Sequence, residues 1–138
     1  MADIALIYSV KADADTVYRA VSTADGIAGW FTDGAEVDGD IQRLTFPGQP
    51  APWEWRVTGA DAGRRLTLKV LAGPEDWVGT EVVYAIESTE EGSLLRFDHN
   101  GFPAADDHFR HTAATWAGLF PVLQKYAETG APTPFFIN

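Results

Sequence analysis

Between Gly34 and Gly101, apolar and polar residues alternate along the chain, and short turn signals interrupt the alternation. The turn signals are Asp38-Gly39-Asp40, Gly59 to Gly63, Gly73-Pro74 and Glu91-Gly92. A period of two sends successive side chains to opposite faces of a strand, so the pattern predicts an antiparallel meander with one dry face. The residues predicted to lie on this dry face are Leu44, Phe46, Trp53, Trp55, Val57, Leu66, Leu68, Val70, Val82, Tyr84, Ile86, Leu95 and Phe97.

The segment before the meander predicts one strand and two short helices. Residues 4–10 alternate and contain β-branched and aromatic residues, which is typical of a strand. Asp13 or Asp15 can cap a following helix, because a carboxylate accepts hydrogen bonds from the free N–H groups of the first turn. A second helix is expected to end near Trp30-Phe31.

A long helix is predicted after the meander, beginning near Asp106-Asp107 and ending before Gly130. Its apolar stripe comprises Phe109, Ala113, Trp116, Phe120, Leu123 and Ala127. Pro121 lies inside this helix, where its ring removes the hydrogen bond to the Ala117 carbonyl and is expected to kink the helix. The order of elements predicts one α+β domain over residues 1–138 with about six to seven strands.

Composition excludes several classes of function. The 138 residues contain no cysteine, so a disulfide framework and a cysteine nucleophile are excluded. The net charge of −10 repels phosphate backbones and anionic lipids, which makes nucleic acid a poor candidate partner. No signal peptide or membrane-spanning segment is recognised, and we expect a cytoplasmic protein.

Several short motifs, in this order, resemble one known superfamily. They are Val17-Tyr18-Arg19-Ala20, Trp30-Phe31, Gly92-Ser93-Leu94-Leu95-Arg96-Phe97, His99-Asn100-Gly101-Phe102, Trp116 with Leu119 and Leu123, and Tyr126-Ala127-Glu128-Thr129-Gly130. They are similar to the START-like (SRPBCC) superfamily, and within it to the bacterial branch related to the activator of heat-shock protein ATPase. The resemblance implies a helix-grip fold, in which a curved sheet wraps around the C-terminal helix and leaves a cavity.

The resemblance has limits in this chain. Family members often have a histidine four residues before the helical tryptophan and a glycine just before it, whereas this chain has Thr112 and Thr115. The family name suggests stimulation of a chaperone ATPase. In eukaryotic co-chaperones that activity involves an additional N-terminal domain, so a chaperone partner is not carried over to these 138 residues.

Large aromatic residues on the predicted dry face are candidates to line the cavity, since ligand sites are mostly apolar with few polar groups. The candidate ligand-binding residues are Phe46, Trp53, Trp55, Tyr84, Phe97, His99 and Trp116. Simple core packing is the alternative for each aromatic residue. Trp77 falls in a loop, where either a rim or lid role or a surface contact would explain it.

His99 and Tyr84 are the candidate catalytic residues. The alternation sends His99 to the dry face, where it could orient a ligand or exchange a proton, with Tyr84 as its expected partner. The alternative is a neutral structural histidine. His108 and His111 are three residues apart, but they lie toward the edge of the helix stripe, so we predict flanking histidines and no metal site. No cofactor motif is present.

Three functional hypotheses follow from the sequence. The first is a binding protein for a small hydrophobic molecule, aromatic or lipid-like. The second is a cyclase- or aromatase-like enzyme that uses the same cavity, as the resemblance implies. The third is an accessory domain for protein interaction, with an apolar patch around Trp77 and the tail Phe135-Phe136-Ile137. Either patch could also be the contact of a homodimer.

Overall fold

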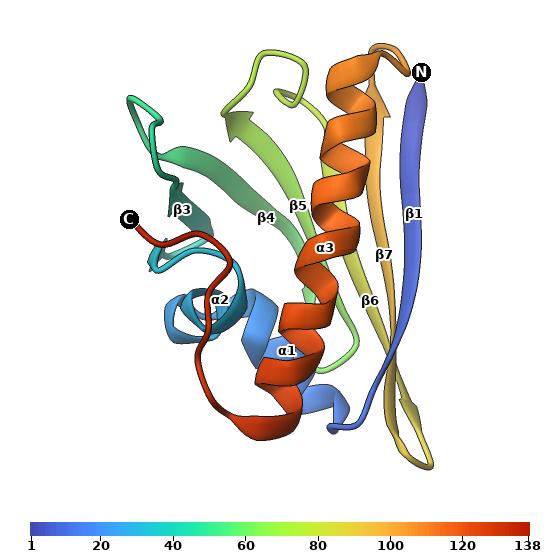
Figure 1. Cartoon of the computed structure of the whole chain (residues 1–138). Coiled ribbons are helices and arrows are strands. Elements are labelled where there is room, and N and C mark those ends of the chain that lie inside the picture. The colour runs from blue at the N-terminus through green and yellow to red at the C-terminus, as the bar shows by residue number, and fades with distance from the viewer.

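The computed structural model describes all 138 residues as one sheet, two short helices and one long helix (Figure 1). The elements in chain order are β1 (Ala2–Val10), α1 (Ala14–Ser22), α2 (Ala24–Trp30), β2 (Gly34–Asp38), β3 (Ile41–Thr45), β4 (Trp53–Asp61), β5 (Arg65–Ala72), β6 (Glu81–Thr89), β7 (Gly92–Phe102) and α3 (Asp107–Thr129). Each predicted element is present, and the meander spans six strands. The predicted α+β fold is therefore confirmed.

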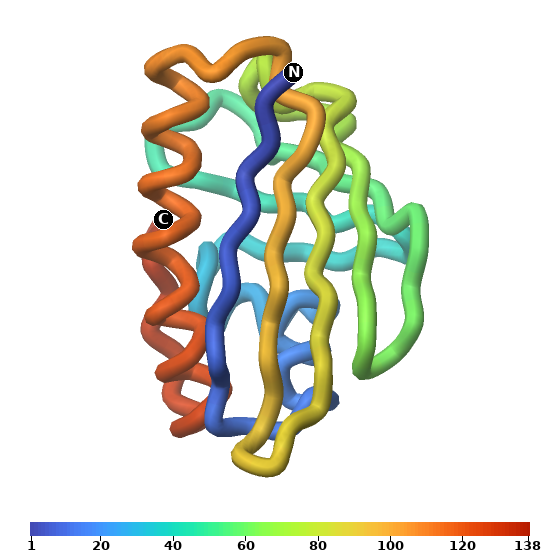
Figure 2. The backbone as a smooth tube through the Cα atoms, turned by 90° about the vertical axis from the view of Figure 1, so that its right-hand side faces the viewer, coloured from blue at the N-terminus to red at the C-terminus, as the bar shows by residue number.

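The seven strands form a single antiparallel sheet in the order β1-β7-β6-β5-β4-β3-β2. The N-terminal strand β1 pairs with β7 and adds a seventh strand at the far edge of the meander. Figure 2 shows the sheet curving, with α3 on one side and the outer face of the sheet left uncovered. This is a helix-grip arrangement, in which α3 lies across the concave face.

The register explains the alternation seen in the sequence. Tyr84 of β6 lies opposite Phe97 of β7, and both side chains are buried. On the same two strands, Arg96 and Glu87 point outward and form an exposed ion pair. The buried residues of the concave face, α1, α2 and α3 make up one hydrophobic core. Burial of these apolar side chains is the main stabilising contribution to the fold.

Polar residues fix the ends of the helices. Asp13 and Asp106 accept hydrogen bonds from the first turns of α1 and α3, at Thr16 and Phe109. Thr23 caps α2 in the same way. Gly130 ends α3 in the left-handed conformation, with φ of 75°. These caps position α3 so that its buried stripe faces the sheet.

Pro121 does not interrupt α3, which runs unbroken from Asp107 to Thr129. The proline removes the helical partner of the Ala117 carbonyl. The hydroxyl of Tyr8 donates a hydrogen bond to that carbonyl at 3.3 Å. A side chain of β1 therefore replaces the missing N–H and ties the middle of the helix to the edge of the sheet.

The segment after α3 runs back along α2 toward the edge of the sheet that β2 and β3 form (Figure 1). Backbone bonds run from Phe135 to Trp30 and from Phe136 to Phe31, and the side chain of Asn138 binds Asp33 and Thr32. The hydrogen bonds from Asn138 lower the pKa of the Asp33 carboxyl. We call residues 131–138 the tail, and it packs back onto the domain.

None of the three helices combines the length and apolar character needed to cross a membrane.

Candidate ligand pocket

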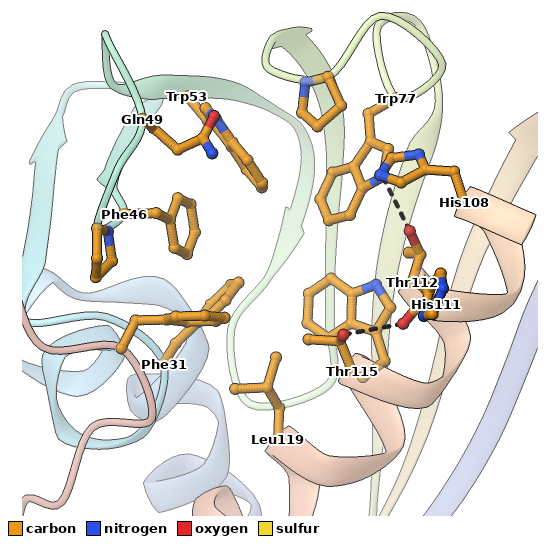
Figure 3. Close-up of a pocket in the computed structure, with 14 residues that line it drawn as sticks. Phe31, Phe46, Gln49, Trp53, Trp77, His108, His111, Thr112, Thr115 and Leu119 are labelled. Atoms are coloured by element: carbon orange, nitrogen blue, oxygen red, sulfur yellow. Dashed lines mark hydrogen bonds between the residues drawn. The ribbon is translucent and has the colours of Figure 1, made fainter.

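A pocket of about 220 Å³ opens between the tip of the sheet and the N-terminal half of α3 (Figure 3). Two walls face one another across open space in this view. One wall comes from the end of α2, the β3–β4 loop, β4 and the tail, and the other from the β5–β6 loop and α3. The lining residues are Phe31, Phe46, Pro47, Gln49, Trp53, Pro74, Trp77, His108, His111, Thr112, Thr115, Trp116, Leu119 and Phe136.

The first wall is aromatic. The ring of Phe46 lies with its centroid 4.3 Å from that of Trp53 and 5.1 Å from that of Phe136. Phe31 packs behind them, 5.3 Å from Phe46. Such tilted and edge-to-face contacts are favourable geometries for aromatic pairs and hold the rings in place. The tail thus contributes one of the rings of the wall.

Trp77 dominates the second wall. It lies in the β5–β6 loop, yet its side chain is only 7% exposed. Its indole N–H donates to the Thr112 hydroxyl of α3 at 3.3 Å, and its ring lies nearly parallel to that of Trp116, at an interplanar angle of 19°. Its ring also contacts that of Trp53, with centroids 5.0 Å apart, so the two walls touch at this point. Of the two roles that the sequence left open, the structure places Trp77 at the pocket.

A polar contact joins the same loop to α3 at the rim. Nδ1 of His108 lies 2.5 Å from a carboxylate oxygen of Asp76, the residue before Trp77. His111 also lines the rim and, like His108, is exposed. The sequence pattern placed both histidines toward the edge of the helix stripe, and the pocket opens at that edge of α3, so both lie on its rim. His, Asp and Glu side chains do not gather in groups of three as a metal site would require.

His99 lies behind this wall and is fully buried. Trp116 donates its indole N–H to Nδ1 of His99 at 3.1 Å, so Nδ1 carries no proton. Nε2–H then donates to the Thr80 hydroxyl at 2.8 Å, and Thr80 donates in turn to the Trp77 carbonyl at 2.5 Å. The imidazole is therefore neutral, and it connects the two tryptophans of the second wall.

The structure separates the two predicted catalytic residues. His99 bonds to Thr80 and Trp116, so the expected His99–Tyr84 pair was wrong. Tyr84 lies opposite Phe97 on the neighbouring strand, whereas Val82 lies opposite His99. Burial lowers the pKa of His99 to about 3 and raises the pKa of Tyr84 far above its ordinary value. Neither side chain lines the pocket.

The predicted ligand-binding residues divide into two groups. Phe46, Trp53 and Trp116 line the pocket together. The remaining four, Trp55, Tyr84, Phe97 and His99, are buried in the core at its base or beyond it. Trp55 is fully enclosed, and its indole N–H has no hydrogen-bond partner. Their period-two spacing identified the correct face of the sheet, but α3 covers the centre of that face.

Other lining residues were not among the sequence candidates. Phe31 follows a helix end, Phe136 lies in the tail, and Leu119 and Thr112 lie on α3. The helical spacing of Thr112, Trp116 and Leu119 is a signal that these side chains share one face. The sequence holds no comparable signal for Phe31 and Phe136, because their positions depend on where the tail crosses the domain.

A second hollow, of about 450 Å³, lies between the end of β1 and the C-terminal half of α3. Its lining is almost entirely polar and includes Lys11, Glu91, Lys125 and Glu128. A larger volume with a wet, charged lining offers little apolar surface to a ligand. The aromatic pocket is therefore the stronger candidate site.

The fold and the pocket define a helix-grip domain with an aromatic pocket between its sheet and its long helix. Residues 11–128 match the family model described as Activator of Hsp90 ATPase homolog 1-like protein. This match covers most of the chain, so the chain belongs to that family. Comparison with curated proteins gave no match.

Solved structures with the same fold include an Aha1 dimer from Colwellia psychrerythraea. That structure is 27% identical, covers 94% of this chain and 98% of its own, and superposes with a TM-score of 0.84. An AHSA1-like protein from Aeromonas hydrophila is 20% identical, with 94% of each chain covered and a TM-score of 0.72. DynU16, from the dynemicin biosynthetic locus, is 23% identical over 99% of this chain and 51% of its own, with a TM-score of 0.76.

Proposed function

We propose that this protein binds a small, flat, hydrophobic molecule in the pocket between the sheet tip and α3. The observation that carries the proposal is the composition of the two walls, which present tryptophan and phenylalanine rings to one shared space. Binding sites for small molecules are typically concave and apolar, with few polar groups. The lining contains no Asp, Glu, Lys or Arg, which favours an uncharged ligand.

The size of the pocket restricts the ligand. Drug-sized ligands occupy sites of roughly 300–1,000 Å³, and this pocket measures about 220 Å³. A molecule smaller than a typical drug, thin enough to lie between two aromatic walls, fits this space. A flat aromatic compound therefore suits the pocket better than a lipid with a long acyl chain.

An enzymatic role is less well supported by the side chains present. A general acid or base must reach the proton that it transfers, and both ring nitrogens of His99 are already bonded to protein groups. Tyr84 is enclosed in the core. We therefore favour binding over a cyclase- or aromatase-like reaction at these two residues.

The test is a binding measurement on a variant with a filled pocket. Thr115 lines the pocket and is exposed on α3, so Thr115→Trp places an indole in the open space. We expect saturable quenching of tryptophan fluorescence by a panel of small aromatic ketones and hydrocarbons. The filled variant should bind at least about tenfold more weakly, which corresponds to 1.4 kcal/mol.

Thr129→Trp is the matched control. Thr129 lies on the same helix, and its hydroxyl donates to the carbonyl four residues earlier, as that of Thr115 does. It lies outside the aromatic pocket. This control should bind like the unmodified protein. Equal affinity in both variants, or no binding by any compound of the panel, would contradict the proposed function.

Self-association stays a prediction. The similar protein from Colwellia psychrerythraea was solved as a dimer. In this chain β1 and β2 are the two unpaired edges of the sheet, and Phe135 and Ile137 of the tail are 49% and 69% exposed. Unpaired edges and exposed apolar side chains are surfaces on which a second copy can pack.

A further inference from the structure

Two threonines on the same face of α3 use their hydroxyl groups differently. Thr115 donates to the His111 carbonyl four residues earlier at 2.9 Å, as threonine commonly does inside a helix. Thr112 makes no such bond. Its hydroxyl oxygen accepts the indole N–H of Trp77 at 3.3 Å, and its own hydrogen is donated to no protein group.

Thr112 is 5% exposed and lines the pocket. A hydroxyl has one hydrogen to donate and two lone pairs to accept with, so the bond from Trp77 leaves the hydrogen of Thr112 free. Buried polar hydrogens are almost always bonded in native proteins. A free donor at the edge of a pocket is therefore a group that a ligand can satisfy.

The other buried donors at the pocket are already committed. The indole N–H of Trp77 is bonded to Thr112, and that of Trp116 is bonded to His99. Thr115 and Gln49 are exposed, as are the two rim histidines. Among the buried lining residues, Thr112 alone offers a donor to the space between the aromatic walls.

We infer that the ligand is a neutral aromatic compound that carries an acceptor oxygen, such as a ketone, and that Thr112 donates a hydrogen bond to this oxygen. The inference rests on the proposed function and specifies its ligand. The absence of Lys and Arg from the lining disfavours a carboxylate or phosphate as the acceptor. Trp77 helps to orient the Thr112 hydroxyl. Because the indole N–H donates to the hydroxyl oxygen, the hydroxyl hydrogen is directed away from the indole.

The experiment compares two compounds of nearly the same shape, 2-acetylnaphthalene and 2-isopropenylnaphthalene. The first has an oxygen where the second has a CH₂ group. Dissociation constants are measured by titration, following the five tryptophan indole N–H signals by NMR. We expect the ketone to bind about threefold to tenfold more tightly, the range that one neutral hydrogen bond provides.

Variants then assign the preference to one side chain. Thr112→Val keeps the shape and removes the hydroxyl, so it should bind both compounds equally. Thr112→Ser keeps the hydroxyl and should retain the preference for the ketone. Thr129→Val removes a hydroxyl that lies outside the aromatic pocket and is already bonded to the Lys125 carbonyl, and it too should retain the preference. The readout is the ratio of the dissociation constants of the two compounds. A general loosening of the Trp77 loop would weaken the binding of both compounds alike and leave this ratio unchanged.

The outcomes separate this inference from the proposed function. Equal binding of both compounds to the unmodified protein, or a preference that survives in Thr112→Val, overturns the role of Thr112 while the binding function stands. Failure of both compounds to bind contradicts the proposed function and this inference with it. A preference that is lost only in Thr112→Val supports both.

Discussion

At the scale of single residues, His99 shows what a buried polar group does near a pocket without touching a ligand. Each ring nitrogen has one protein partner, and the two partners lead to Trp116 and, through Thr80, to Trp77. The side chain is a positioning residue for the second wall. The alternation predicted that His99 faces inward. It could not predict that Trp116 of α3 would be its hydrogen-bond partner, because that depends on how α3 packs on the sheet.

His99 should make the stability of the protein depend on pH. Its pKa is lowered to about 3 in the folded state, below the ordinary 6.5, so the unfolded chain binds a proton more readily between these values. Stability is therefore present in full above about pH 6.5 and is lost as the pH falls toward 3. Between pH 7 and pH 5 we expect this group to cost about 2 kcal/mol.

Urea unfolding at pH 7 and pH 5 checks this expectation. His99→Gln should have a lower free energy of unfolding at pH 7, because it disrupts the network. The decrease in its free energy of unfolding from pH 7 to pH 5 should be about 2 kcal/mol smaller than in the unmodified protein. His111→Gln removes an exposed histidine and serves as the control, which should keep the full loss. An identical loss in His99→Gln and the unmodified protein would show that His99 does not titrate in this way.

At the scale of elements, the β5–β6 loop supplies Pro74 and Trp77 to the second wall of the pocket. Backbone bonds from Trp77 and Val78 to Pro74 make it a compact turn, and Thr80 bonds back to Trp77. Its polar contacts with α3 are the Trp77–Thr112 bond and the Asp76–His108 pair. The loop is therefore fastened to the helix by two polar contacts, one buried and one at the rim.

Loss of the rim contact should speed ligand release. Asp76→Asn removes the carboxylate that contacts His108, and we expect the dissociation rate to rise up to about fivefold, the range for one polar contact at a protein surface. Glu75→Gln removes the neighbouring exposed carboxylate, which forms no ion pair, and should leave the rate unchanged. Stopped-flow displacement of a bound aromatic ketone measures both rates. Equal rates in the two variants would mean that the Asp76–His108 contact does not slow ligand release.

The sequence predicted the elements more completely than the site. Alternation, helical spacing and capping residues are local signals, so they identified the meander and the end of α3 at Gly130, and they narrowed the cap of α1 to Asp13 or Asp15, of which Asp13 is the cap. The pocket depends on which part of the concave face α3 leaves open, and this is a property of packing. Phe46 and Trp53 lie at the uncovered end of the sheet, whereas Phe97 has the same spacing signal and lies under the helix.

At the scale of the whole molecule, the tail runs from the end of α3 to the segment between α2 and β2. Its Phe136 lines one side of the pocket. Phe136 contacts both Phe31 and Phe46, with centroids 6.3 Å and 5.1 Å apart. The last turn of α3 meets α2 at Gly29, where any side chain would overlap the ring of Tyr126. The pocket is therefore built from segments that come together only in the complete fold.

Removal of one tail ring should affect stability and binding together. Phe136→Ala deletes a partly buried ring from the first wall, and we expect a loss on the order of 2 kcal/mol together with weaker ligand binding. Phe135→Ala removes the adjacent ring, which is 49% exposed, and should change both quantities little. Thermal unfolding and the ketone titration provide the two measurements. A Phe136→Ala protein with unchanged affinity would exclude the tail from the binding site.

The clustering of tryptophans around the pocket also determines how the protein absorbs and emits light. Trp77 lies with its ring centroid 5.0 Å from Trp53 and 6.2 Å from both Trp55 and Trp116. At such separations the electronic transitions of neighbouring indoles couple, and excitation passes among them before it is emitted. The far-ultraviolet dichroism, where indole absorbs most strongly, should therefore carry an exciton couplet that reports the arrangement of the four rings. A single molecule in the pocket should quench light absorbed by indoles that it never touches.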